Sequence, residues 1–111
     1  MNEKRKEFAS FLEDCAARCK EQAELCARDG REDEAVFEKI KLNVYDIFKT
    51  VFNTLGEGEF FEAKLREIPA AWQISLEKAA AHGDEEKAHI ESIKLEAAQK
   101  IEDKFNGIWG E

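Results

Sequence analysis

The stretch ELCARDGREDEAVFEKIKL, residues 24–42, has a close counterpart 53 positions later in EKAAAHGDEEKAHIESIKL, residues 77–95. At the same offset, residues 2–58 align with residues 55–111 without a gap and with 14 identical positions. Self-similarity at a fixed offset along a whole chain is typical of an internal duplication. We therefore expect two similar units, residues 2–55 and 56–108, within a single domain of residues 1–111.

Each copy of the quoted stretch contains the signals of a turn between two helices. Gly30 and Gly83 follow alanine-containing segments, and acidic residues crowd the positions just after them. Glycine readily adopts the left-handed conformation that ends a helix, and acidic side chains stabilise the first turn of the next one. The sequence therefore predicts one helical hairpin per unit, with Asp84 as an N-cap and Gly56-Glu57-Gly58 as the linker.

Apolar residues recur in all four segments at alternating steps of three and four, the spacing of one helix face. We predict helices over residues 3–28, 32–55, 59–82 and 84–107. The expected core positions, helix by helix, are Phe8, Leu12, Cys15, Cys19, Ala23 and Cys26; Phe37, Ile40, Val44, Ile47, Val51 and Leu55; Phe61, Leu65, Ile68, Trp72, Leu76 and Ala79; and Ile90, Ile93, Ala97, Ile101, Phe105 and Ile108. Two such hairpins bury their apolar stripes against each other, which predicts an all-α, antiparallel four-helix bundle.

The second predicted helix carries more apolar residues than one seam requires. Leu42, Tyr45, Phe48 and Phe52 lie beside its expected seam, and the aligned positions of the fourth helix are less aromatic. A helix with so wide an apolar face either lies at the centre of a bundle or contacts another chain. These four residues are therefore candidate interaction residues for a homodimer or a protein partner. The alternative is a monomer with a broad core.

Proline inside the third predicted helix sets the two units apart. Pro69 aligns with Ala16. Because proline lacks a backbone donor and clashes with the preceding turn, we expect the helix to kink or to split near Ile68. Pro69 and the neighbouring Trp72 are candidate residues of a ligand pocket. The alternative is a bend tolerated on the solvent side.

The three cysteines share one stripe of the first predicted helix. Cys15, Cys19 and Cys26 fall within about 40° of one another around the helix axis. Thiolates so placed would suit a soft metal such as Cu(I) or Zn²⁺, or a redox pair. The aligned residues are Ile68, Trp72 and Ala79, and cysteine packs well as a small core residue. We therefore assign no metal and no cofactor, and keep the thiols as the alternative site.

A fragment of a di-iron motif occurs in the fourth predicted helix. Glu86 and His89 have the Glu-x-x-His spacing from which di-iron bundles are built. A complete site needs two such units, whereas Val36 stands at the position aligned with His89. We therefore expect His89 to be a partly buried neutral imidazole and not a metal ligand.

Two charged pairs recur in the alignment. Glu38 and Lys41 align with Glu91 and Lys94. At a spacing of three residues such pairs are expected to form ion pairs on the helix surface. The alternative is that the duplicated carboxylates frame a symmetric site.

Composition restricts the partners and the compartment. The chain has 25 acidic and 17 basic residues, a net charge of −8 that repels nucleic-acid phosphates. The stretch MNEKRKEFASFLEDC, residues 1–15, has charges where a signal peptide needs an apolar run, and no segment approaches the ~18 apolar residues of a membrane span. Three cysteines cannot all pair within one chain. We therefore expect a soluble cytoplasmic protein that binds neither nucleic acid nor membrane.

No catalytic motif accompanies the helical pattern. The sequence has no phosphate-binding loop, no Gly-rich cradle and no Ser–His–Asp arrangement that we recognise. We therefore expect a protein-interaction or structural module that is not an enzyme. The alternative function is a thiol-based metal-binding or redox protein.

Overall fold

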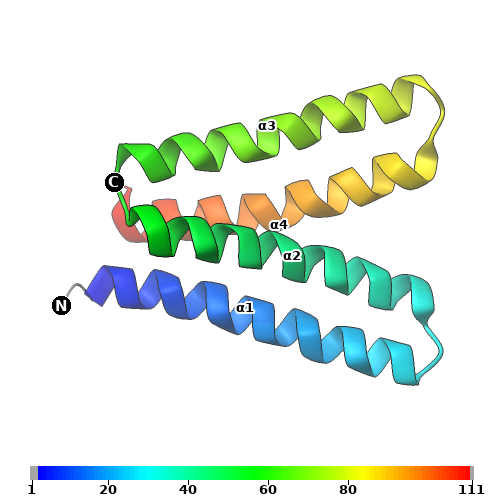
Figure 1. Cartoon of the computed structure of the whole chain (residues 1–111), viewed down its shortest axis with the longest axis horizontal. Helices are drawn as coiled ribbons and strands as arrows, with labels where there is room; N and C mark the ends of the chain where they lie inside the picture. Colours follow the sequence, from blue (N-terminus) through cyan, green and yellow to red (C-terminus); the bar gives the residue numbers. More distant parts are fainter. Residues whose placement is uncertain (1–2, 111) are drawn as a thin grey trace.

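The computed structural model describes residues 3–110 and contains four helices in chain order (Figure 1). They are α1 (Glu3–Arg28), α2 (Glu32–Leu55), α3 (Glu59–Ala81) and α4 (Glu85–Trp109). No strand occurs in this part of the chain. The predicted all-α, antiparallel four-helix bundle is confirmed. Three of the predicted helix starts match the observed ones, and the fourth lies one residue later.

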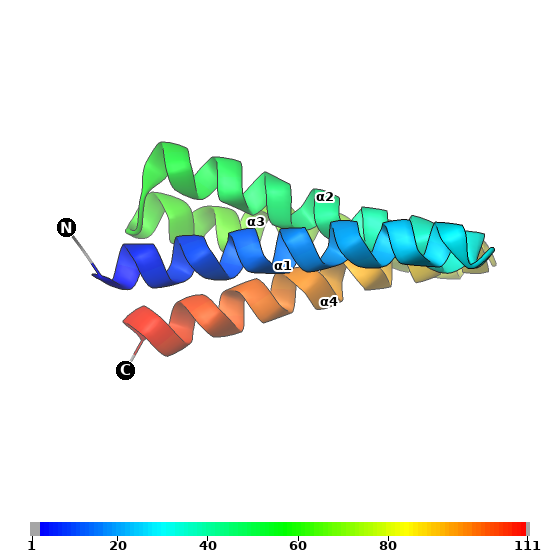
Figure 2. The same ribbon diagram turned by 90° about the horizontal axis from the view of Figure 1, so that it is seen from below.

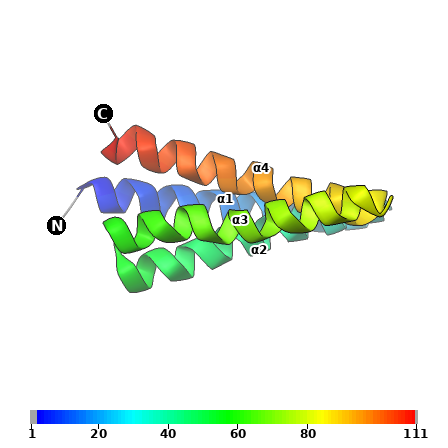
Figure 3. The ribbon, with the colours of Figure 1, turned by 90° about the horizontal axis from the view of Figure 1, so that it is seen from above.

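The bundle is built from two hairpins that diverge. α1 pairs with α2 and α3 pairs with α4, while α2 and α4 form the main contact between the hairpins. In Figure 1 the hairpins lie close together at the end that carries the termini and separate toward their loops. Figures 2 and 3 show four helices around a common centre at the terminal end and a flatter arrangement at the loop end. The hairpins therefore contact each other mainly through α2 and α4.

One phenylalanine from each helix meets at the terminal end of the bundle. The Phe8 ring lies 4.8 Å from Phe52, 5.7 Å from Phe61 and 5.6 Å from Phe105, measured between ring centroids. All three contacts are edge-to-face, the geometry that the charge distribution of aromatic rings favours. Trp109 of α4 packs against the same rings. This aromatic cluster holds all four helices together.

The two hairpin turns have the same backbone structure. Gly30 and Gly83 adopt φ angles of +77° and +74°, which only glycine reaches without strain. The residues that follow them donate backbone hydrogen bonds of 2.8 Å to the carbonyls of Cys26 and Ala79. The carboxylate of Asp84 accepts a hydrogen bond from the backbone amide of Lys87, with a donor–acceptor distance of 3.1 Å. The predicted glycine turns and the predicted N-cap are therefore confirmed.

α2 is rotated relative to the prediction. Its buried face contains Tyr45, Phe48 and Phe52, at 4%, 0% and 5% exposure, together with Val44. Leu55, at the end of the expected seam, is 42% exposed. The rotation follows from volume, because the larger aromatic side chains fill the centre where α1, α3 and α4 meet α2. The buried face of α2 therefore lies to one side of the expected seam around the helix axis.

α3 runs through Pro69 without a break, and the predicted split does not occur. The half-buried proline lies inside the helix, where it leaves one carbonyl without its usual partner. α4 continues past the predicted end at residue 107 to Trp109, whose ring joins the aromatic cluster. Across residues 3–110, no helix combines the length and apolar content that crossing a bilayer requires.

Candidate functional site

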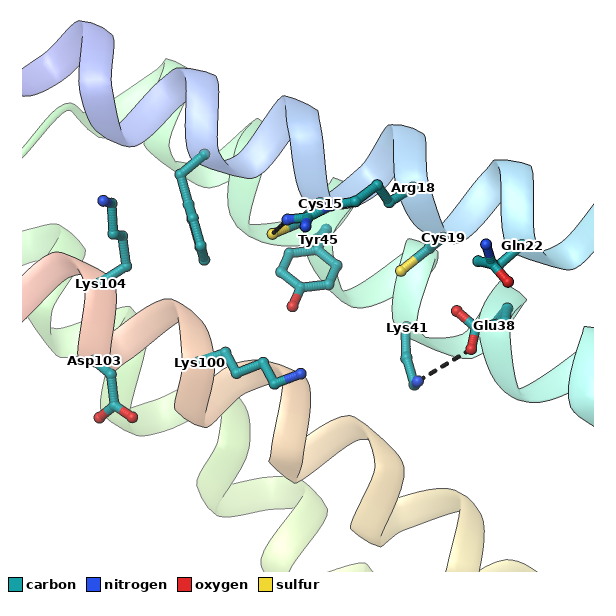
Figure 4. A pocket seen from close by; sticks show the side chains of 11 residues that line it. Cys15, Arg18, Cys19, Gln22, Glu38, Lys41, Tyr45, Lys100, Asp103 and Lys104 are labelled. Carbon is teal, nitrogen blue, oxygen red and sulfur yellow. Dashed lines mark hydrogen bonds and ion pairs between the residues drawn. The ribbon is translucent and has the colours of Figure 1, made fainter.

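A hollow of about 550 Å³ lies between α1, α2 and α4 (Figure 4). Its walls are Phe11, Cys15, Arg18, Cys19 and Gln22 of α1; Glu38, Lys41 and Tyr45 of α2; and Lys100, Asp103 and Lys104 of α4. A second hollow of about 330 Å³ adjoins it toward the loops and shares Gln22, Glu38 and Lys41. Together the two hollows form a groove along α1, which exists because the hairpins diverge toward the loops.

Two of the predicted thiols lie at the floor of this groove. Cys15 and Cys19 are 7% and 8% exposed and belong to the main hydrophobic core. A guanidinium nitrogen of Arg18, Nη2, donates to Cys15 Sγ at 3.5 Å. Tyr45 of α2 reaches the same region and packs edge-to-face against Phe11, with ring centroids 6.4 Å apart. The burial of these two thiols is therefore consistent with the expected core role.

The surroundings of the floor favour the protonated forms of Cys19 and Tyr45. Burial, with a further contribution from the Glu38 carboxylate, raises the pKa of Cys19 from 9.0 to about 11. Burial and the neighbouring Cys15 thiol likewise raise the pKa of Tyr45 above its usual range. A nucleophilic or metal-binding thiol needs the opposite shift, toward thiolate at neutral pH. The site therefore offers no activated nucleophile at Cys19.

We predict that native Cys19 reacts slowly with a thiol reagent. In a variant with Cys15→Ala and Cys26→Ala, Cys19 is the sole thiol. Raising its pKa from 9.0 to about 11 lowers the thiolate population at pH 8 about 100-fold, and burial slows attack further. Labelling with Ellman's reagent should therefore be at least about 100-fold slower in the native protein than in urea. Equal rates, with the native fold verified by circular dichroism, would refute this prediction.

Cys26 lies apart from the other two thiols. It is 4% exposed, and its Sγ lies 4.0 Å from a carboxylate oxygen of Glu34 in the second hollow. Within residues 3–110, no group of three or more His, Cys, Asp or Glu side chains is arranged to hold a metal ion. The structure therefore does not bring the three cysteines together as one ligand set.

The repeated charged pairs form the expected ion pairs. Lys41 lies 3.1 Å from Glu38, and Lys94 lies 2.7 Å from Glu91. The two pairs differ in burial, because the Glu91 side chain is 6% exposed and that of Glu38 is 22% exposed. Lys94 also lies over the Trp72 ring, 5.7 Å from its centroid. The pair at Glu91 is therefore built into the contact between α3 and α4.

His89 is exposed, contrary to the expected partial burial. Its ring contacts Phe37 of α2 edge-to-face at 4.8 Å, across the gap between the hairpins. The prediction was wrong because His89 lies in the first turns of α4, next to the loop, where it lines the second hollow. Glu86 is also exposed, so the fragment of a di-iron motif faces water.

Pro69 and Trp72 have different surroundings. Pro69 lines a hollow of about 370 Å³ on α3 and α4, next to Leu65, Leu95 and Ala98. Trp72 does not line that hollow and packs instead against the hydrophobic core, half-buried beside Lys94. A ligand pocket at Pro69 and Trp72 therefore stays a prediction.

The predicted interaction face of α2 is not available at the surface. Tyr45, Phe48 and Phe52 are buried within a single chain, and Leu42 is half-buried against the same core. The wide apolar face is explained by the central place of α2, which contacts all three other helices. The burial of Tyr45, Phe48 and Phe52 favours the alternative of a monomer with a broad core, and Tyr45 also lines the hollow.

Exposed apolar side chains occur instead on the outer face of α3, which the sequence reading missed. Phe60 is 74% exposed and Ile74 is 54% exposed. At 100° per residue they lie within about 40° of one another, some 21 Å apart along the helix. In the 53-residue alignment they stand opposite Glu7 and Glu21. Because charged residues occupy the aligned positions, the alignment indicates that Phe60 and Ile74 lie at the surface.

Comparisons with protein families, with curated proteins and with solved structures returned no match for this chain. The site is therefore interpreted from its own residues.

Proposed function

We propose that the protein is a non-catalytic interaction module that associates with a second copy of itself through the outer face of α3. The proposal is based on the exposure of Phe60. A phenylalanine with 74% of its surface in water gains roughly 1.5–3 kcal/mol when a partner buries it. Ile74 and the exposed Ala71 extend the same apolar face along the helix.

The charges on this face suit contact with an identical surface. Lys64 and Glu67 lie between Phe60 and Ile74, and their side chains pair with each other at 3.4 Å. The face therefore carries little net charge where two copies would meet. α3 is also well suited to accept a partner, because it packs mainly on α4 and leaves its opposite side in solvent.

Sedimentation equilibrium tests this proposal. We expect the wild-type protein to dimerise at high concentration, and Phe60→Glu with Ile74→Glu to weaken dimerisation at least about 10-fold. Added salt should strengthen the wild-type dimer, because each copy carries a net charge of −8. Val36→Glu replaces a 49% exposed side chain on α2 and serves as the matched control.

A wild-type protein that stays monomeric at millimolar concentration would refute this interface. Equal weakening by the Val36→Glu control would also refute it, because the effect would then be one of charge alone.

The raised pKa values of Cys19 and Tyr45 support a function without covalent catalysis or thiol redox chemistry. The three free cysteines support a reducing, cytoplasmic compartment. The acidic balance of the chain supports a protein partner in preference to nucleic acid.

A further inference from the structure

The hollow between α1, α2 and α4 is cationic in an acidic protein. Four of its lining residues are basic, namely Arg18, Lys41, Lys100 and Lys104, against the two carboxylates of Glu38 and Asp103. The chain as a whole has a net charge of −8. Low-dielectric walls strengthen the potential of charges gathered in a cleft. The hollow therefore attracts anions locally, on a molecule that repels large polyanions.

Two of these cations lack a carboxylate partner. Lys41 pairs with Glu38, and Lys104 pairs with Glu7 at 3.0 Å. Within residues 3–110, neither Arg18 nor Lys100 forms an ion pair, and Arg18 reaches only the Cys15 sulfur. Their charges are therefore available to a ligand.

Polar groups from facing helices point into the same space. In Figure 4 the ammonium groups of Lys41 and Lys100 extend into the hollow from α2 and α4, and the Tyr45 hydroxyl lies between these walls. A tyrosine hydroxyl is protonated at neutral pH, so it is able to donate a hydrogen bond to an anion. The two cations without a carboxylate partner, Arg18 and Lys100, and the Tyr45 hydroxyl together provide suitable donors for a single acidic group.

The hollow also has an apolar part. Phe11, with the Lys104 ammonium 5.7 Å from its ring centroid, forms one wall, and Cys15 and Cys19 form the floor. A volume of about 550 Å³ falls in the range of small-molecule sites, which combine apolar walls with a few convergent polar groups. The dimensions and the chemistry both suit a small molecule with one charged end.

We infer that this hollow binds a small amphipathic anion, with its acidic group between Lys100, Arg18 and Tyr45 and its apolar body against Phe11 and the thiols. A carboxylate and a phosphate monoester share the required chemistry. The site is separate from the α3 face and does not depend on the proposed self-association.

Isothermal titration calorimetry of the full chain tests this inference with three ten-carbon probes: decanoate, decyl phosphate and the neutral decanol. We expect at least one of the two anions to bind at least about 10-fold more tightly than decanol, because charge-assisted hydrogen bonds are made only by the acidic group. Comparison of the two anions then identifies the preferred acid.

Charge reversal locates the site. Lys100→Glu should weaken anion binding at least about 10-fold, whereas Lys87→Glu changes the charge of α4 equally at an exposed position outside the hollow and should leave binding nearly unchanged. Circular dichroism and the urea midpoint of each variant verify its fold. Amide shifts in NMR spectra should concentrate at the residues that line the hollow.

Three results would overturn the inference. The first is no binding of either anion at millimolar concentration. The second is decanol binding as tightly as the anions, which would indicate insertion into the aromatic cluster. The third is equal weakening by Lys100→Glu and Lys87→Glu, which would indicate a general effect of net charge.

Discussion

Replacing Phe8 with alanine should destabilise the protein by about 3–5 kcal/mol, the usual cost of removing a fully buried aromatic side chain. Phe8 is 0% exposed, and its ring contacts Phe11 of its own helix and one or more rings from each of α2, α3 and α4. The substitution therefore leaves a cavity at the point where all four helices meet. Urea unfolding followed by circular dichroism measures the loss.

Phe60→Ala is the matched control, because it removes the same side chain from a helix in the same protein. Phe60 is 74% exposed, so the change in unfolding free energy should stay within about 0.5 kcal/mol. The measurement is best made at low protein concentration, where self-association contributes nothing. Similar losses for Phe8→Ala and Phe60→Ala would contradict the structure of the aromatic cluster.

Replacing Lys94 with methionine should cost about 1–3 kcal/mol, because it leaves the Glu91 carboxylate without its partner. The Glu91 side chain is only 6% exposed and lies 2.7 Å from the Lys94 ammonium. Methionine preserves most of the apolar stem, so the loss reports the missing charge and its contact with Trp72. Thermal and urea unfolding at neutral pH both measure it.

The aligned pair supplies the control. Lys41→Met leaves Glu38, whose side chain is 22% exposed, in contact with water, and it should cost less than about 1 kcal/mol. Adding Glu91→Gln to Lys94→Met should recover part of the lost stability, since a neutral amide is cheaper to bury than a carboxylate. A larger loss for Lys41→Met than for Lys94→Met would show that burial does not decide the strength of these pairs.

The fold was largely predictable because its signals are local. Helix periodicity, the glycines at the two turns and the Asp84 cap each act within a few residues, and the structure contains all of them. The alignment also matches Phe8 with Phe61 and Phe52 with Phe105 as identical positions. These four rings meet in the core. α4 was longer than predicted because the distant ring of Phe8 holds Trp109 in place.

The candidate site was less predictable because it depends on how the hairpins meet. The sequence singled out Cys15, Cys19 and Tyr45, which do lie together at the floor of the hollow. It gave no reason to join them with Lys100, which is 55 to 85 residues away along the chain, because that contact follows from the packing of α4. The same packing buried the predicted interface of α2 and left Phe60 exposed.

The amino-acid sequence by itself determined the number of helices, their starts to within one residue, their pairing into hairpins and most of the core, because hydrogen bonds and apolar periodicity act over short distances along the chain. Only the tertiary structure decided the rotation of α2, the divergence of the hairpins and the cationic hollow between α1, α2 and α4. These features depend on how side-chain volumes from four helices fill one shared space, and the pattern along any single helix does not specify that fit.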